Sequence, residues 1–222
     1  MIVAILVGGK ATRMKNYTPK PKPLIKINKI EILKLILNIY QKNKLSTFYL
    51  LCRSDNINQF NQFKKKYKNI NITILDTGLN SETGKRINFL KKIVKEEKFC
   101  LTYGDSLANF NLKKSLKMTK VVTMCIFKKK SSFGNIKIKK KQINEFSEKK
   151  KIDYINAGFY IINKEIFSYT NKNISFEKTI IPKLIKKKMV DFVYVNDWHP
   201  MDNKFDYLSI KEWVKNKKFL NG

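Results

Sequence analysis

An unbroken apolar run that ends at two glycines most constrains how this chain can fold. Residues 2–7 read IVAILV, and Gly8 and Gly9 follow directly. A strand that is apolar at every position is buried on both faces, as in a parallel sheet covered by helices. The run is too short to cross a membrane or to form the core of a secretion signal. It therefore predicts a buried parallel strand that ends in a tight loop.

Strands and helices alternate along the first half of the chain. The spacing of its apolar side chains predicts an amphipathic helix over residues 30–43. The same patterns predict strands at 47–52, 70–75 and 99–103, and helices at 56–68 and 86–95. Beyond these we expect strands at 121–127, 134–138 and 154–162, a helix at 176–187, a strand at 192–195 and a helix at 205–215. The alternation predicts an α/β fold, a doubly wound mixed and mostly parallel sheet, in a single domain spanning residues 1–222.

The composition indicates a folded protein with reduced cysteines. Hydrophobic residues make up 43% of the chain and charged residues 29%, which is typical of globular proteins rather than disordered ones. Cys52, Cys100 and Cys125 lie in apolar runs and lack the short spacing of a metal site. We expect buried thiols in a cytoplasmic protein that has neither a disulfide scaffold nor a membrane segment.

The strong positive charge raises nucleic acid as a partner. Lys and Arg number 47 against 17 Asp and Glu, a net charge of +30. Only Arg13, Arg53 and Arg86 are arginines, however, and the guanidinium is the group that reads bases and phosphates in a bidentate way. A nucleic-acid-binding module would show clustered arginines and aromatic stacking platforms, and neither is visible. We interpret the lysines as solvated surface with weak polyanion binding and no specific nucleic acid partner.

The loop after the first strand is a candidate phosphate-binding loop. Paired glycines let backbone N–H groups approach phosphate oxygens, and Arg13 adds a fixed positive charge nearby. The loop lacks the third glycine of the dinucleotide-binding motif. Residues 78–86 resemble a P-loop but have an extra residue and an arginine in the magnesium-binding position. Taken alone, Gly8 and Gly9 are equally compatible with a plain turn.

Further charged residues fall in loops that follow strands. Lys22 lies between prolines, which hold the loop extended, so it is a candidate phosphate ligand or else part of an exposed basic loop. Asp105 comes just after the strand at 99–103, and Asp202 ends an aromatic loop. Two aspartates together with phosphate oxygens suit Mg²⁺. His199 is the only histidine and is interpreted as a packing or loop residue.

These motifs together resemble the sugar-1-phosphate nucleotidyltransferases, and among them most closely the glucose-1-phosphate cytidylyltransferases. The family's motifs occur in order and cover residues 1 to about 215. They are L-x-G-G-x-G-T-R at 6–13, P-K-P-[ML] at 21–24, D-T-G at 76–78, T-G-G-R at 83–86, F-C-F-T-Y-G-D at 99–105, F-x-E-K at 146–149, I-N-G-G-F at 155–159 and W-x-P-M-D at 198–202.

The resemblance implies a Rossmann-like nucleotidyltransferase fold and a magnesium-dependent reaction. A nucleoside triphosphate, preferably CTP, would react with a sugar 1-phosphate, preferably glucose 1-phosphate, to give a nucleoside-diphosphate sugar and pyrophosphate. The implied catalytic residues are Arg13, Lys22 and Asp105, and the implied Mg²⁺ ligands are Asp105 and Asp202. The implied nucleotide-binding residues are Leu6, Val7, Gly8, Gly9, Lys10, Ala11, Thr12, Thr83, Gly84, Arg86 and Gly104. The implied sugar-phosphate residues are Glu148, Lys149, Asn156 and Glu177.

Several positions depart from the family pattern and leave alternatives open. Ala11, Lys85 and Ala157 stand where the family has glycine. The motifs therefore predict triphosphate binding but leave the identity of the base and of the sugar open. One alternative is another member of the family, such as a heptose-1-phosphate guanylyltransferase. Another is a sugar-nucleotide-binding domain without catalysis. The sequence also leaves the oligomeric state open, a homo-oligomer included.

Overall fold

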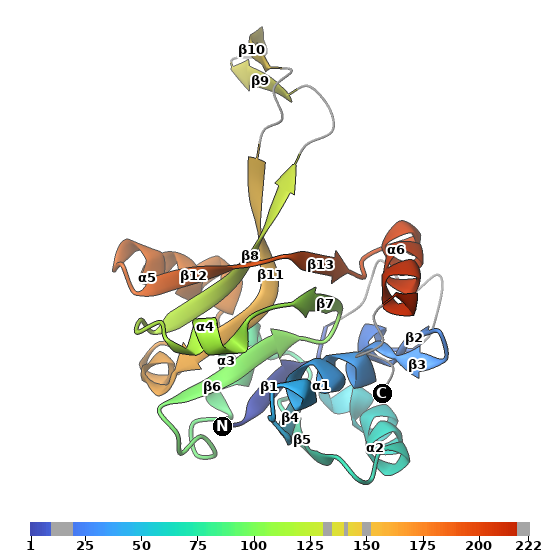
Figure 1. Cartoon of the computed structure of the whole chain (residues 1–222). Helices are drawn as coiled ribbons and strands as arrows, with labels where there is room; N and C mark the ends of the chain where they lie inside the picture. The colour runs from blue at the N-terminus through green and yellow to red at the C-terminus, as the bar shows by residue number, and fades with distance from the viewer. Residues whose placement is uncertain (10–19, 131–134, 140–141, 148–151, 217–222) are drawn as a thin grey trace.

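A seven-stranded sheet forms the centre of the molecule (Figure 1). The computed structural model describes residues 1–9, 20–130, 135–139, 142–147 and 152–216. The strand order is β12-β8-β11-β6-β1-β4-β5. The strands are β1 (Val3–Leu6), β4 (Thr47–Cys52), β5 (Asn71–Asp76), β6 (Lys98–Tyr103), β8 (Val122–Lys130), β11 (Ile152–Asn163) and β12 (Val190–Val195).

The sheet is mixed and mostly parallel, which confirms the predicted fold class. Strands β5, β4, β1 and β6 run parallel, and β12 is parallel to β8. Only β11 is antiparallel to its neighbours, β6 and β8. The carboxyl ends of β1, β4 and β6 therefore meet at one edge of the sheet.

Helices cover both faces of the sheet. They are α1 (Ile32–Lys42), α2 (Ile57–Lys66), α3 (Thr83–Asn88), α4 (Leu112–Leu116), α5 (Ile181–Lys186) and α6 (Lys204–Lys215). Val3 and Ile5 of β1 belong to one buried cluster together with α1, α2, α4 and α6, whereas Ala4 and Leu6 belong to a second cluster with α3 and α5. β1 is thus buried on both faces, as its apolar run predicts.

Two of the predicted helices depart from a regular α-helix over their predicted ranges. The helix expected at 86–95 begins earlier, as α3, and passes into tighter turns with i→i−3 hydrogen bonds such as Leu90 N to Ile87 O. The helix expected at 176–187 starts as a π turn (Phe176–Ile180) before α5, because Pro182 lies at the start of α5 and has no N–H to continue a regular ladder.

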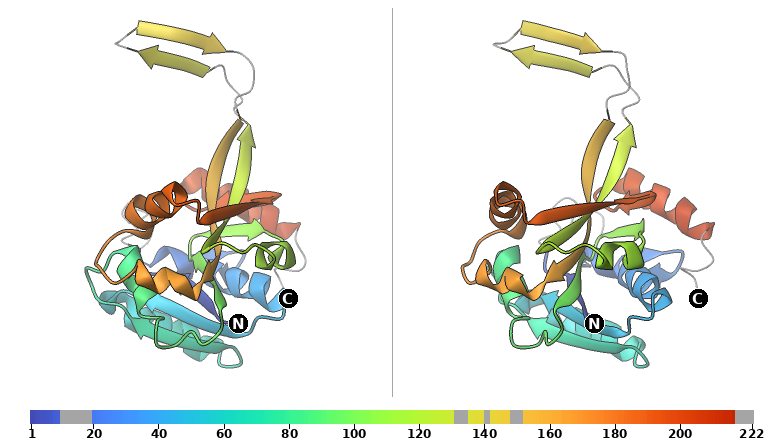
Figure 2. Two further views of the ribbon diagram at one scale, coloured as in Figure 1. Left: turned by 90° about the vertical axis from the view of Figure 1, so that its left-hand side faces the viewer. Right: turned by 60° about the vertical axis from the view of Figure 1, so that its left-hand side comes forward.

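Three short strand pairs lie outside the main sheet. β2 (Lys26–Ile27) and β3 (Ile30–Glu31) form a hairpin whose turn residues Asn28 and Lys29 have positive φ, and this hairpin delays the start of α1 to Ile32. β9 (Asn135–Lys139) and β10 (Gln142–Ser147) pair beyond the extended ends of β8 and β11 (Figure 2). β7 (Ser106–Asn109) pairs antiparallel with β13 (Asp197–Pro200). The β7–β13 pair, which the sequence did not predict, helps to build the site.

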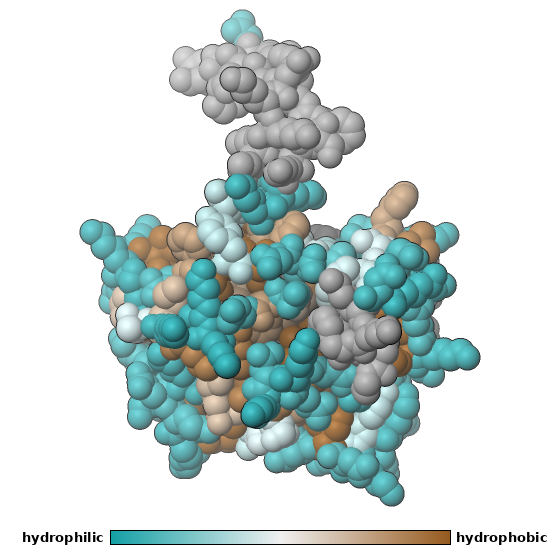
Figure 3. Space-filling view, viewed as in Figure 1, coloured by the Kyte–Doolittle hydropathy of each residue, from teal (hydrophilic) through white to brown (hydrophobic). Residues whose placement is uncertain are grey.

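Polar side chains cover most of the face of the molecule that Figure 3 shows, with apolar residues between them. In the described part of the chain, no helix is both long and apolar enough to span a bilayer.

Candidate active site

A cleft of about 700 Å³ opens where the parallel strands end. Gly8 and Gly9 follow β1, Arg53 follows β4, and Gly104 and Asp105 follow β6. All five residues line the cleft, which is the position expected for a ligand in an open α/β sheet. The other lining residues are Leu6, Val7, Lys22, Pro23, residues 79–83, Arg86, Tyr103 and Asp202.

A second, smaller recess of about 90 Å³ adjoins the cleft. Tyr103, Asp105 and Asp202 line both spaces and so form their junction. The remaining lining residues of the small recess are Ser106, Asn156, Ala157, Gly158, Trp198 and Pro200. Two ligands in the two spaces would meet at this junction.

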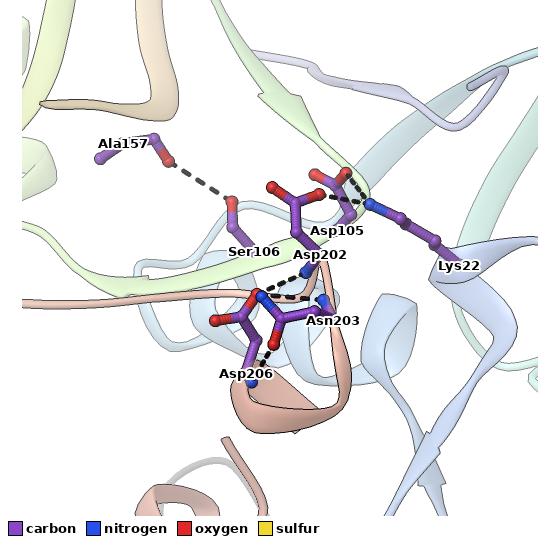
Figure 4. Close-up of polar contacts among 7 residues, drawn as sticks. All are labelled: Lys22, Asp105, Ser106, Ala157, Asp202, Asn203 and Asp206. Carbon is purple, nitrogen blue, oxygen red and sulfur yellow. Dashed lines mark hydrogen bonds and ion pairs between the residues drawn. The ribbon is translucent and has the colours of Figure 1, made fainter. Parts of the chain in front are cut away.

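Lys22 and two aspartates converge at the junction (Figure 4). The Lys22 ammonium lies 2.5 Å from Oδ1 of Asp202 and 3.6 Å from Oδ2 of Asp105. The lysine side chain is only 12% exposed, whereas the two carboxylates are 41% and 48% exposed. The sequence-based alternative of an exposed basic loop is therefore wrong for Lys22.

The proline-rich loop holds Lys22 in place. Lys22 opens a 3₁₀ turn (Lys22–Leu24) in which the N–H of Leu24 donates to the carbonyl of Pro21. Pro23 is buried and lies so close to Gly104 that a Cβ added to this glycine would be 2.7 Å from its ring. Glycine after β6 therefore lets the lysine loop approach the strand end that carries Asp105.

Asp202 reaches the junction through the β7–β13 pair. Pro200 pairs with Ser106, and the N–H of Met201 donates to the carbonyl of Asp105 at 2.9 Å. Trp198 also donates from Nε1 to the carbonyl of Ala157 in β11. These contacts bring residues that are far apart in the sequence to one point.

The electrostatics of the junction favour a cation. Burial raises the pKa of Asp105 most, Lys22 opposes this shift, and the like charge of Asp202 raises the pKa further. Among the described residues, no group of three or more His, Cys, Asp or Glu side chains could hold a metal alone. The two carboxylates fit Mg²⁺, which commonly takes one or two carboxylates and completes its shell with water and phosphate oxygens.

Arg86 lies directly beneath the glycine loop. Its guanidinium is buried, and it donates to Thr77 Oγ1 and to the carbonyl of Ser81. A Cβ on Gly8 would lie 2.1 Å from Nη1 of Arg86, so a larger residue here would displace the guanidinium from this position. Burial and then the neighbouring charge of Arg53 lower the pKa of Arg86.

Arg53 is a cleft residue that the sequence interpretation missed. Its guanidinium donates twice to the Asp55 carboxylate, at 3.0 and 2.7 Å. Its position in the sequence indicates a cleft residue, because Arg53 directly follows the strand predicted at 47–52. Gly8 follows the strand at 2–7 in the same way, and Asp105 comes two residues after the strand at 99–103.

A hydrogen-bonded cluster around Glu177 contacts residues that line the recesses. The Glu177 carboxylate accepts from Thr83 at 2.6 Å, from Ser175 at 2.8 Å and from the Tyr103 hydroxyl. Burial, then the neighbouring Tyr160 and Glu177, raise the pKa of Tyr103 well above its usual value. Glu177 lies outside the lining of both recesses, so its carboxylate orients Thr83 and Tyr103, which do line them.

The remaining predicted site residues are placed as follows. Asn156 lines the small recess and donates to the Tyr160 hydroxyl at 2.5 Å. Gly84 is buried behind the cleft, where its N–H donates to the carbonyl of Ile174. The predicted site residues outside the described part of the chain are Lys10, Ala11, Thr12, Arg13, Glu148 and Lys149.

The histidine and the cysteines are packing residues, as predicted. His199 packs against Trp213, with ring centroids 4.5 Å apart and the ring planes tilted by 33°. Cys52, Cys100 and Cys125 are buried free thiols. Burial raises the pKa of all three, in the case of Cys125 to about 12.

Comparisons with known proteins agree with the geometry. The family model described as "Nucleotidyl transferase" matches residues 2–212. The chain is 32% identical to the "Probable glucose-1-phosphate cytidylyltransferase" of Bacillus subtilis, over 96% of both chains. It is 28% identical to the glucose-1-phosphate cytidylyltransferase of Salmonella typhimurium, over 98% of this chain and 97% of that one. The solved structure of the inositol-1-phosphate CTP transferase from T. maritima superposes with a TM-score of 0.75 at 16% identity, over 96% of this chain and 94% of that chain.

Proposed function

Because the chain belongs to the nucleotidyl transferase family, we propose that it transfers CMP from CTP to glucose 1-phosphate, giving a nucleoside-diphosphate sugar and pyrophosphate. The activity of two relatives, named above as glucose-1-phosphate cytidylyltransferases, supports this choice of substrates. The observation that carries the proposal is the junction, where Lys22, Asp105 and Asp202 meet between a large and a small recess. The large recess suits the nucleotide and the small recess suits the sugar phosphate.

The chemistry requires positioning and charge neutralisation rather than a protein nucleophile. An oxygen of the sugar phosphate forms a bond to the α-phosphorus as the bond from that phosphorus to the pyrophosphate oxygen breaks, and pyrophosphate leaves with the electron pair. The attacking phosphate is already ionised near neutral pH, so no general base is needed. Two polyanions must approach each other in line, and the protein lowers the barrier by holding and neutralising them.

Each residue of the junction would have its own part in holding the phosphates or neutralising their charge. Lys22 lies where the α-phosphate and the sugar phosphate would meet and offers one positive charge to both. Asp105 and Asp202 would hold Mg²⁺, which when bound supplies further neutralisation of phosphate oxygens. Gly8 and Gly9 both line the cleft, and Gly8 lies against the guanidinium of Arg86. By resemblance, Arg13 neutralises the leaving pyrophosphate, Lys149 contacts the sugar phosphate, and Glu148 is a candidate for binding sugar hydroxyls.

The base-side departure from the family pattern does not oppose CTP. Lys85 replaces a family glycine, but it is exposed and lies outside the lining of the cleft. The residues that do line this side are 79–83 and Arg86. A guanylyltransferase acting on a heptose 1-phosphate is the second candidate, because the chain is also 29% identical to the D-glycero-alpha-D-manno-heptose 1-phosphate guanylyltransferase of Campylobacter jejuni, over 80% of this chain and 84% of that one.

Release of pyrophosphate by the purified chain tests the proposal. Each of the four ribonucleoside triphosphates is combined with a panel of sugar 1-phosphates, including glucose 1-phosphate and a heptose 1-phosphate, with Mg²⁺ and with the metal chelated. The proposal predicts release with CTP and glucose 1-phosphate that depends on the metal. Release only with GTP and a heptose 1-phosphate would establish the second candidate. Binding of nucleotide without release from any pair would indicate a domain without catalysis.

A further inference from the structure

The carboxylate of Asp206, in the first turn of α6, lies outside both recesses but holds the residue that reaches them. We propose that Asp206 is a positioning residue that fixes the backbone of Asp202 and thereby directs the Asp202 carboxylate to the junction. The inference rests on the proposed function, in which Asp202 acts beside Lys22 and Asp105. It assigns a role in the site to a residue that touches neither substrate recess.

The sheet contacts that bring the chain to the junction stop just before Asp202. The last pair of the β7–β13 ladder is Pro200 with Ser106, and the buried Met201 adds one bond to the carbonyl of Asp105. At the next residue, the N–H of Asp202 donates to Oδ2 of Asp206 at 2.8 Å. Up to Met201, the backbone is therefore held by bonds to the backbone of β7 and Asp105. The N–H of Asp202, whose carboxylate enters the site, is held by a side chain instead.

The same Asp206 oxygen also accepts from the N–H of Asn203, at 3.1 Å. Two N–H groups on one carboxylate oxygen hold two consecutive peptide units, and hydrogen bonds to a charged acceptor are stronger than neutral ones. Figure 4 shows Asp206 beneath the turn, with the Asp202 side chain directed away from it toward Lys22. A rotation of this turn would carry Oδ1 of Asp202 away from the Lys22 ammonium, which now lies at 2.5 Å.

A purely structural role is the competing explanation. Asn203 is the N-cap of α6, and its side chain accepts from the N–H of Asp206 at 3.0 Å, which completes a capping box. Asp206 could therefore serve only to stabilise the helix start. The variant Asn203→Ala distinguishes the two explanations. It removes the side chain that caps the helix but leaves the bonds from the N–H groups of residues 202 and 203 to the Asp206 carboxylate in place.

The test compares Asp206→Ala, Asp206→Asn and Asn203→Ala with the parent protein. The measurements are kcat and KM, Mn²⁺ binding followed by the EPR signal of the free ion, thermal stability, and amide exchange of residues 201–203. We expect Asp206→Ala to lower kcat/KM and to weaken Mn²⁺ binding by about 10- to 100-fold, as loss of a residue that orients a metal ligand does. Asn203→Ala should lower Tm by a similar amount to Asp206→Ala, because it removes the cap, and should change kcat/KM by no more than about twofold, because it leaves Asp202 held. Asp206→Asn keeps an oxygen acceptor and should fall between the two.

The outcomes decide between the roles. Equal losses of kcat/KM in Asp206→Ala and Asn203→Ala would overturn positioning in favour of helix capping, and so would unchanged Mn²⁺ binding in Asp206→Ala. If the parent protein turns over no substrate pair, the proposed function fails, but the inference is still tested. In that case faster exchange of the Asp202 amide and weaker Mn²⁺ binding in Asp206→Ala alone would support positioning, and equal effects in both variants would overturn it.

Discussion

The Lys22 ammonium lies against two carboxylates that come from distant parts of the chain, and this arrangement sets the properties of the junction. One positive charge partly neutralises Asp105 and Asp202, and burial together with Asp202 keeps the pKa of Asp105 raised. Two carboxylates against one ammonium leave an excess of negative charge when both are ionised, and a bound cation would neutralise it.

Asp105→Ala should abolish most of the activity and leave the fold intact. The substitution removes one of the two carboxylates that fit Mg²⁺, and loss of such electrostatic stabilisation lowers turnover by about 10² or more. Pyrophosphate release measures turnover, and circular dichroism measures the fold. Asp191→Ala is the matched control, because Asp191 pairs with Lys120 at the far edge strand β12. Near-normal turnover of Asp105→Ala would remove the magnesium assignment.

Lys22→Ala should lose turnover by about 10², as expected when a fixed charge at the reacting phosphate is removed. It should also make the protein's stability more sensitive to Mg²⁺. Without the ammonium, Asp105 and Asp202 face each other uncompensated, so Mg²⁺ should raise the Tm of this variant more than that of the parent. The control is Lys20→Ala, an exposed lysine of the same loop that lies outside both recesses. A Tm of Lys22→Ala that does not respond to Mg²⁺ would contradict this account.

At the scale of elements, hydrophobic pattern predicts the sheet better than it predicts the site. The buried run at 2–7 and the strand at 47–52 are confirmed, because the apolar spacing of a buried element depends on little but its own sequence. The β7–β13 pair was missed, because each strand is short and the two are joined only by contacts distant in sequence. The π turn before α5 was not predicted, because the apolar spacing of a helix does not show whether each N–H bonds to the carbonyl four or five residues earlier.

Glu31 joins two elements, and its contribution to stability should depend on pH. It precedes α1 and accepts from Lys66 and Tyr67 at the end of α2, at 2.7 to 2.9 Å. Burial acts to raise the pKa of Glu31, but these hydrogen bonds outweigh it and leave the pKa below its usual 4.5. A carboxylate with a lowered pKa stabilises the fold above pH 4.5, and this contribution is lost as the pH falls through the lowered value.

Glu31→Gln should therefore lower the free energy of unfolding by about 1–3 kcal/mol at pH 7, the range for losing hydrogen bonds to a charged group. Urea denaturation at pH 7 and at pH 3 measures the difference from the parent protein, which should shrink at the lower pH. Glu212→Gln, at an exposed ion pair with Lys215, serves as the control. A difference that grows at low pH would contradict the role given to Glu31.

At the scale of the whole molecule, topology explains why so much of the site could be predicted. Parallel strands place their carboxyl ends together, and this brings the candidate residues of the loops after β1 and β6 into one cleft. Asp202 was predicted from its loop and from family resemblance, but the partners that position it were not. The contact of Tyr103 with Glu177 joins distant parts of the chain, which no local pattern encodes. Asp206 belongs to a local capping box, but that pattern does not show that its carboxylate also holds Asp202.

The net charge of +30 should produce weak polyanion binding without sequence preference. The lysines interact with phosphates as point charges, so affinity for duplex DNA should fall steeply between low and physiological salt. Fluorescence anisotropy with two unrelated duplexes measures this. A clear preference for one sequence that persists at physiological salt would contradict the interpretation of the lysines as solvated surface.

The central claim, nucleotidyl transfer at the α-phosphorus, is tested most directly by ³¹P NMR of the protein with CTP, glucose 1-phosphate and Mg²⁺. The account predicts the appearance of free pyrophosphate together with the two coupled resonances of a new diphosphate diester, the nucleoside-diphosphate sugar, at equal rates. Release of orthophosphate, with the glucose 1-phosphate signal unchanged, would place cleavage at the γ-phosphorus and contradict the account.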